Sequence, residues 1–300
     1  MTWRAWITFS ILCVLWGVPY FFIKLALVEL SPVFIAWGRL TLATLVLVPI
    51  ALHRKVFFPA LKHKGAIFAF AVTELVFPFS LISIGEQWIS SSMAGVLVAT
   101  VPLTVLLIAP LFGVKEEVGA RRLFGLLVAL FGVVVLLGVD TISGLYQWIG
   151  VACIFGAVVG YAVGPLIVQR YLADVDELGA LSASLLCSSI ILLPIALWTG
   201  PSLVPSLLSI SSIVVLGVFS TALALLMYFY LINEAGAARS SVVAYVCPAI
   251  AALLGVTILD EPFGIGLAAG LVLILVGSWL GTGGMKKKEM AEAKTAEQQA

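Results

Sequence analysis

Ten apolar segments, each about as long as a membrane-crossing helix, follow one another along the chain. They cover residues 5–24, 33–52, 65–85, 91–112, 122–139, 147–168, 178–198, 207–232, 240–259 and 264–284. A helix needs about 20 predominantly apolar residues to cross the hydrocarbon core of a bilayer. Short turns with charged residues, Gly and Pro separate the segments. The pattern predicts an all-α integral membrane protein with ten transmembrane helices.

The composition excludes a soluble protein. Of the 300 residues, 62% are hydrophobic and 10% are charged, whereas soluble domains have roughly 45–50% apolar and about 25% charged residues. The net charge of +1 gives no overall attraction to nucleic acid. We therefore expect the lipid bilayer, and no nucleic acid, among the partners. The four cysteines lie in apolar runs without the spacing of a metal site, which predicts buried thiols and neither a metal nor a cofactor.

Lysine and arginine are distributed unevenly among the turns. If the N-terminus is cytoplasmic, 14 of the 16 lysines and arginines fall in cytoplasmic turns or at the two chain ends. The outer turns have none. Because positively charged segments stay on the cytoplasmic side, we expect both termini in the cytoplasm and a cytoplasmic tail over residues 285–300. The expected location is the cell membrane, of the bacterial inner-membrane type.

The two halves of the chain resemble each other at an offset of 145–146 residues. Four matches share it: Pro-Ile-Ala-Leu at 49–52 and 194–197, Trp16 with Tyr161, Pro102 with Pro248, and Gly125 and Gly132 with Gly270 and Gly277. Each repeat then has five helices, the first over residues 5–139 and the second over 147–284. Because five is odd, the repeats are expected to be inverted in the membrane. Such halves can expose a central site to either side in turn, although a duplicated scaffold remains an alternative.

Several short motifs lie at the ends and centres of these helices. They are Leu15-Trp16-Gly17, Lys24, Ser31-Pro32, Arg39-Leu40, Ser92-Met93-Ala94, Pro102, Glu116-Glu117, Gly125 and Gly132, and in the second half Ser240-Ser241-Val242, Ala244-Tyr245, Pro248, Asp260-Glu261-Pro262, Gly270 and Gly277. Because of these motifs, the chain resembles the EamA branch of the drug/metabolite transporter superfamily over nearly its whole length. The resemblance implies two EamA repeats and export of amino acids, other metabolites or drugs. Related branches carry nucleotide sugars and sugar phosphates.

Glu74 and Arg39 are ionisable residues within the predicted spans. Glu74 lies deep in the third segment, where a charge costs about 2.5–3.5 kcal/mol on insertion scales. It is a candidate for contact with substrate or a proton, for a structural ion pair, or for a wet cavity wall. Arg39 is expected to pair with Glu74, to hold a substrate carboxylate or to extend to the surface. Lys24, near the end of its helix, is interpreted as an interfacial anchor beside Glu29.

Aromatic residues supply further candidates for the substrate path. Trp16 and Tyr20 share one helix face, and the repeat places Trp16 opposite Tyr161. Such rings form a gate or stack on an apolar or cationic substrate, or they only fill helix crossings. Tyr228 and Tyr245 are candidates of the same kind.

Prolines inside spans remove backbone donors and loosen the helix. The aligned Pro102 and Pro248 are therefore candidate hinges, with static kinks as the alternative.

The expected function is a secondary transporter that exports a small organic solute, foremost an amino acid or related metabolite, by alternating access. The solute gradient or protons would supply the energy, because the sequence has no ATP-binding loop. A sugar-phosphate or nucleotide carrier and a membrane scaffold are the alternatives. An enzyme is not expected: His53 and His63 lie in a cytoplasmic turn, HExxH is missing, and no catalytic residue is assigned. A channel is not favoured, because the sequence has no motif of an ion-selectivity filter. The protein is expected to be a monomer or a homodimer.

Overall fold

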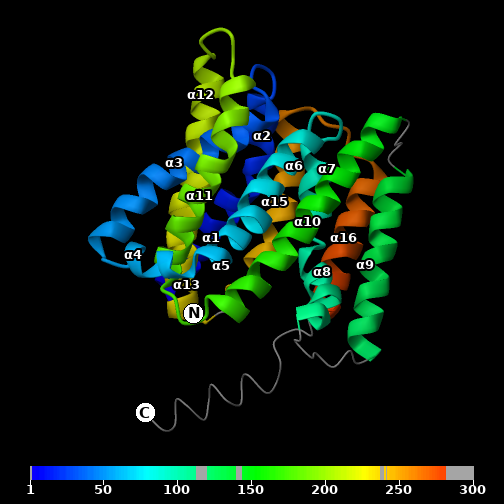
Figure 1. Ribbon diagram of the computed structural model, residues 1–300. Coiled ribbons are helices and arrows are strands. Elements are labelled where there is room, and N and C mark those ends of the chain that lie inside the picture. Colours follow the sequence, from blue (N-terminus) through cyan, green and yellow to red (C-terminus); the bar gives the residue numbers. More distant parts are fainter. Residues whose placement is uncertain (1, 113–119, 140–143, 237–239, 241, 282–300) are drawn as a thin grey trace.

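The computed structural model describes residues 2–112, 120–139, 144–236, 240 and 242–281. The predicted turn at Glu116-Glu117 and the predicted cytoplasmic tail lie outside these residues. Within them the chain forms helices and turns and no strand (Figure 1).

The first half has twelve described helical elements. They are α1 (Trp3–Gly17), α2 (Pro19–Ala26), α3 (Pro32–His53), α4 (Phe57–Ala60), η1 (Leu61–His63), α5 (Lys64–Phe70), η2 (Ala71–Val76), α6 (Phe77–Gly85), α7 (Ser91–Val98), α8 (Val101–Ile108), η3 (Ala109–Phe112) and α9 (Ala120–Val139). The second half contains α10 (Leu145–Tyr171), α11 (Glu177–Trp198), α12 (Leu207–Val214), η4 (Val215–Leu223), α13 (Ala224–Ala235), α15 (Val243–Ile258) and α16 (Ile265–Gly281). η1 and η3 are 3₁₀ turns, and η2 and η4 are π-helical.

Seven helical runs of the described chain are long and apolar enough to cross a membrane. They are Trp3–Ala26, Pro32–His53, Phe57–Gly85, Ser91–Phe112, Leu145–Tyr171, Glu177–Trp198 and Leu207–Ala235. Shorter apolar helices cover Leu123–Leu137, Val243–Ile258 and Ile265–Leu280. The chain is thus a multi-pass helical membrane protein. The number of ten spans and the cytoplasmic position of both termini stay predictions.

Polar side chains determine where several of these helices begin. Ser31, Ser90 and Ser206 each accept a hydrogen bond from the amide three residues later, at the start of α3, α7 and α12 respectively. Asp176 does the same for α11. These caps satisfy amide groups that would otherwise be unpaired at a helix N-terminus.

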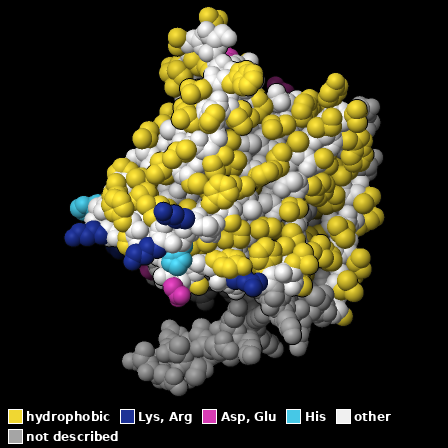
Figure 2. Space-filling model, in the orientation of Figure 1, with side chains coloured by type: hydrophobic (Ala, Val, Ile, Leu, Met, Phe, Trp, Pro, Cys, Tyr) yellow, Lys and Arg dark blue, Asp and Glu magenta, His cyan; other side chains and the backbone are white. Residues whose placement is uncertain are grey.

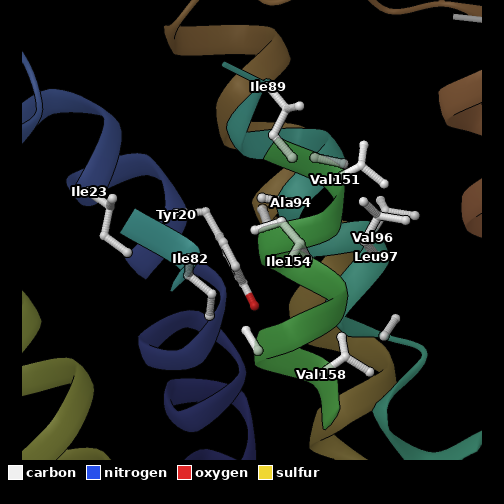
Figure 3. Packing of buried hydrophobic residues seen from close by; sticks show 14 of the residues in the cluster. Tyr20, Ile23, Ile82, Ile89, Ala94, Val96, Leu97, Val151, Ile154 and Val158 are labelled. Carbon is white, nitrogen blue, oxygen red and sulfur yellow. The ribbon is translucent and has the colours of Figure 1, made fainter. Parts of the chain in front are cut away.

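The surface and the core agree with a membrane environment. Apolar side chains cover most of the face shown in Figure 2, whereas lysine, arginine and histidine gather at the end that carries α4 and the chain N-terminus. Inside, one cluster joins both halves: Tyr20 of α2 projects between Ile82 of α6 and Ile154 of α10 (Figure 3). The two repeats therefore share a core instead of forming separate bundles.

Helices α9 and α16 pack directly on each other, and two of the repeated glycines lie in their contact. A Cβ on Gly132 would lie 2.7 Å from the Cβ of Leu273, and one on Gly277 would lie 2.6 Å from the Cβ of Ala129. The missing side chains let the two helices approach closely, as small residues do in membrane proteins.

Candidate functional site

A cavity of about 430 Å³ lies between the two halves of the chain. Its wall includes eight of the residues predicted from the sequence: Trp16, Tyr20, Arg39, Glu74, Pro102, Tyr161, Tyr228 and Pro248. Tyr245 does not belong to the wall, although its neighbour Ala244 does. Most of the lining is apolar, so the few polar groups determine which ligands the cavity can recognise.

Glu74 enters the cavity from the π-helical segment η2. Pro78 follows this segment and has no amide hydrogen for the carbonyl of Glu74, its partner in a regular helix. The chain widens by one residue, and the amide of Phe77 bonds to the carbonyl of Val72, five residues earlier. Such π-helical turns are rare and frequently occur at functional sites.

The carboxylate of Glu74 lies against the bare backbone of Gly164 in α10. A Cβ added at Gly164 would meet Oε2 of Glu74 and would lie 2.9 Å from its Cδ. Oε2 is buried and has no hydrogen-bond partner among the described residues. Glu74 therefore reaches the interface between the halves with hydrogen-bonding capacity unused.

The second π-helical segment, η4, lies at the position that the sequence repeat equates with η2. Ser220, the counterpart of Glu74, lines the cavity, and its buried hydroxyl also has no partner in the described part of the chain. Thr221 donates to the carbonyl of Leu216 at 2.8 Å. The two repeats thus present unlike polar groups at matching positions: a carboxylate from one and hydroxyls from the other.

Arg39 of α3 is buried, with 8% of its surface exposed, and its contacts differ from those expected. Its Nε donates to Oγ1 of Thr221 at 2.8 Å, and its guanidinium carbon lies 4.0 Å from the centre of the Phe79 ring. No ion pair joins Arg39 to Glu74, so the expected structural pairing is wrong. Sequence spacing could not reveal this, because Thr221 comes from the other repeat and the π-cloud of Phe79 already stabilises the cation.

The aromatic rings form two groups in the wall. Trp16 lies against Tyr228, with ring centres 4.9 Å apart, and Tyr161 lies edge-on to Phe79 at 6.4 Å. The repeat placed Trp16 opposite Tyr161, but each ring has a different partner in the structure. Phe79 was not among the predicted site residues, because one phenylalanine in a continuous apolar run gives no signal.

The two candidate hinge prolines lie in unlike surroundings. Pro102 stands in the first turn of α8, directly after the break that separates α7 from α8. Pro248 lies inside the continuous helix α15. Their alignment in the repeat therefore does not correspond to equal helix geometry.

Glu86 is a buried carboxylate in the turn between α6 and α7. It is fully buried, and neither of its carboxylate oxygens has a hydrogen-bond partner among the described residues. Burial raises the pKa of Glu86, and the nearby charge of Lys24 opposes this shift. A carboxylate in a short turn gives no sequence signal for burial, because the cover comes from helices distant in the sequence.

Lys24 has a different role from the expected anchor beside Glu29. Its Nζ donates to the backbone carbonyls of Glu86 at 2.6 Å and Ile89 at 2.9 Å. These carbonyls lie past the end of α6, where a cation is favourable. Lys24 therefore ties α2 to the turn between α6 and α7.

Glu261, in the turn between α15 and α16, caps the N-terminus of α7 in the opposite half. Its Oε1 accepts from the amide of Ser91 at 2.7 Å and from the hydroxyl at 2.8 Å. Its Oε2 accepts from the amide of Ser92 at 2.9 Å and from that hydroxyl at 2.5 Å. All four donors point to one carboxylate, in a position where a helix dipole favours negative charge.

Glu29, in the turn between α2 and α3, makes the corresponding contact in the reverse direction. Its Oε2 accepts from the amide of Ser206 and from the hydroxyl of Ser209, both at 2.8 Å. The hydrogen bond from the Ser206 amide, followed by that from Ser209, lowers the pKa of the Glu29 carboxyl. We call the contacts of Glu29 and Glu261 the capped end. It is the end of the molecule at which α7 and α12 begin (Figure 1).

Several known proteins are similar to this chain over most of its length. An uncharacterized transporter of Archaeoglobus fulgidus is 28% identical over 92% of this chain and 98% of its own. The uncharacterized inner membrane transporter YedA of Escherichia coli K12 is 28% identical over 81% and 79%. Protein PagO of Salmonella typhimurium is 26% identical over 90% and 88%. A solved crystal structure, 18% identical, superposes with a TM-score of 0.66 over 93% of this chain and 96% of that one, which shows a shared fold.

The two halves of the chain enclose the central cavity, and the comparison with families gives the class of protein. The EamA-like transporter family matches residues 3–138 and again residues 148–282. The chain belongs to the EamA-like transporter family and has two copies of its repeat. The resemblance deduced from the sequence motifs is thereby confirmed.

Proposed function

We propose that the protein is a secondary transporter that exports small organic solutes, amino acids or related metabolites, by alternating access. The observation that carries the proposal is the central cavity, which lies between the repeats and has one guanidinium and one carboxylate in an apolar wall. A site between two similar halves is where a carrier of inverted repeats binds its substrate. The cavity volume of about 430 Å³ is within the range of roughly 300–1,000 Å³ of small-molecule sites.

The capped end supports the alternating-access part of the proposal. Glu29 and Glu261 each join one repeat to the other, so both contacts must break for the halves to separate there. If the termini are cytoplasmic, as the charge distribution predicts, this is the outer end. The conformation is then one in which the route to the outside is closed.

The energy source follows from the charges available in the wall. Glu74 binds either the substrate or a proton. If it binds a proton, an imposed pH gradient drives the flux of the substrate. Export is the direction that the family resemblance implies. A sugar-phosphate carrier is the alternative, but Glu74 would repel the phosphate and Arg39 is the only arginine in the described wall.

The test is transport by the purified protein in liposomes. Labelled amino acids, sugars, nucleotides and quaternary amines are offered under two imposed pH gradients, with wild type beside Glu74→Gln. Glu234→Gln is the matched control, because Glu234 is exposed near the end of α13, where it accepts a hydrogen bond from the hydroxyl of Thr2. We expect saturable amino-acid flux in wild type and control. Flux of sugars or nucleotides alone would instead support the alternative carrier, and the absence of any flux would contradict transport.

A further inference from the structure

The turn between α6 and α7 belongs to the first repeat and is held by three other parts of the chain. Lys24 of α2 donates to two backbone carbonyls of the turn, at 2.6 and 2.9 Å. At the start of the turn, Gly85 packs on Gly150 of α10, and a Cβ on either glycine would lie 2.9 Å from the carbonyl oxygen of the other. Glu261 caps α7, the helix that follows the turn. Because α10 and Glu261 belong to the second repeat, separation of the repeats at the capped end disturbs this turn.

Glu86 buries its carboxyl group within this packing. The residue has no exposed surface, and neither carboxyl oxygen has a hydrogen-bond partner among the described residues. Lys24, the cation beside it, donates to backbone carbonyls and not to these oxygens. An ionised carboxylate without donors in such surroundings costs far more free energy than a neutral carboxyl group. The packing of the turn therefore favours the protonated form of Glu86.

The ligand that fits this position is a proton. Both oxygens of Glu86 are enclosed by protein atoms, and a proton needs no space beyond the carboxyl group itself. A metal ion would need several oxygen ligands at about 2.0–2.6 Å. No group of acidic, histidine and cysteine side chains that could hold a metal ion occurs in the described part of the chain.

Several charged or titratable groups surround Glu86. They are Tyr20 and Lys24 of α2, Arg39 of α3, Tyr146 of α10, which stacks on Trp88 of the turn, and Glu261 between α15 and α16. Helices α15 and α16 themselves have no charged residue. Burial is the largest cause that raises the pKa of Glu86. Lys24 opposes this shift, and Glu261 adds to it.

Opening of the capped end changes the affinity of Glu86 for its proton. If water reaches the carboxyl group, its pKa returns toward the ordinary value of about 4.3, and the group ionises at neutral pH. The closed form, which has the higher pKa, is therefore favoured at low pH and loses this advantage as pH rises through that pKa. Between the two pKa values, the ratio of open to closed protein increases by up to about tenfold per pH unit.

We propose that Glu86 is a proton-binding site that couples the capped end to pH: the protonated residue holds this end closed, and the proton leaves when the end opens. The proton passes to the water on the side to which the end opens. The inference rests on the alternating access of the proposed function and adds a residue to it. Glu86 does not line the cavity, so its proton need not compete with a substrate, in contrast to a proton on Glu74.

The test measures opening directly, without substrate or transport. Spin labels are attached through Gln87→Cys in the α6–α7 turn and Phe263→Cys in the α15–α16 turn, two exposed positions on opposite repeats. The four natural cysteines are replaced by alanine in the full-length chain. Double electron–electron resonance in lipid nanodiscs gives the distances between the labels from pH 5 to pH 8. We expect the ratio of separated to close labels to rise with pH, by about tenfold or more over this range.

Variants assign the pH dependence to one carboxyl group. Glu86→Gln has nearly the same shape but cannot ionise, so its labels should stay close at every pH, whereas Glu86→Asp should keep a pH-dependent opening. Glu74→Gln is the matched control for a buried carboxylate and should open as the wild type does. Glu29→Gln is the control at the capped end. It should keep the pH dependence, because the lowered pKa of Glu29 lies below the range of the measurement.

The outcomes separate the proton site from the transporter. If Glu86→Gln opens with pH as the wild type does, the inference is wrong, and loss of the pH dependence in Glu74→Gln would assign the proton to the cavity. If the wild-type distances do not change with pH but saturable flux occurs in liposomes, the inference fails and the carrier remains. If opening follows the expected pattern without flux of any solute, the proton site stands and the transport proposal fails.

Discussion

Glu74 in the cavity and Glu261 at the capped end are both carboxylates that contact the opposite repeat, but their surroundings differ. Glu261 accepts four hydrogen bonds from Ser91 and Ser92, whereas Oε2 of Glu74 accepts none from the described residues. A satisfied carboxylate holds two elements together, and an unsatisfied one is available for a ligand. The difference separates a satisfied contact between the repeats from a carboxylate that has an oxygen without a partner in the described chain, although both residues have the same chemistry.

Gly164→Ala is expected to have the largest effect, because it displaces the carboxylate of Glu74 in the cavity. The added Cβ would occupy the place of the Glu74 carboxylate, and we expect amino-acid flux to fall at least tenfold while helix content is retained. Gly65→Ala is the matched control, because a Cβ there meets nothing within 4 Å. Flux in liposomes and circular dichroism of the same preparations measure the two effects. Wild-type flux in Gly164→Ala would mean that the position of Glu74 does not matter.

Glu261→Ala should remove the hydrogen bonds of Glu261 at the capped end and leave the cavity unchanged. It leaves two amides at the start of α7 without their acceptor, and we expect a loss of about 1–3 kcal/mol of stability. Thermal unfolding in detergent measures the loss, with Glu234→Gln as the control. The affinity for the transported amino acid should change by less than threefold. A large loss of affinity without a loss of stability would show that Glu261 belongs to the binding site.

Glu86→Gln tests a third carboxylate, which is buried but is not part of the cavity wall. Burial raises the folded-state pKa of Glu86 above its unfolded value of about 4.3. Its contribution to stability is therefore present below that value and is lost as pH rises through the raised pKa. We expect the melting temperature of Glu86→Gln relative to wild type to increase from pH 5 to pH 8. A difference that is constant with pH would show that Glu86 does not change protonation on unfolding.

Glu29→Gln should have the smallest effect, because Glu29 is exposed and solvent screens its charge. Its folded pKa is lowered by the donors of α12, so its contribution is present above about pH 4.3 and is lost as pH falls through the folded value. We expect slight destabilisation of the variant at pH 7 and less at pH 3.5. Thermal unfolding at the two pH values measures this, and an effect that grows toward acid would contradict the assignment.

The sequence predicts much of the fold and part of the site, and the reason lies in the range of the interactions. Hydrophobic runs and turns are local properties, so the helices could be located, and the repeat made Trp16, Tyr161 and Pro102 recognisable. Deep burial of a carboxylate also pointed to Glu74. The partners of these residues were not predictable, since Thr221 meets Arg39 and Tyr228 meets Trp16 only through the packing of one repeat on the other.

Glu86 and Lys24 show the same limit at the ends of helices. Both look like ordinary turn or interface residues in the sequence, whereas in the structure Glu86 is buried and Lys24 bonds to the turn between α6 and α7. The π-helix at η2 is an intermediate case. Pro78 predicts a disturbed helix, but the sequence pattern does not distinguish a kinked helix from a widened one.

Counterflow is the measurement that tests the account most directly. Liposomes containing the protein are loaded with unlabelled phenylalanine and diluted into a trace of the labelled amino acid, with Gly65→Ala as the control and Gly164→Ala as the disabled form. Alternating access predicts that label accumulates transiently above its external concentration in wild type and control, and not in Gly164→Ala. Label that only equilibrates, at a rate that does not saturate with concentration, would contradict a carrier with a single central site.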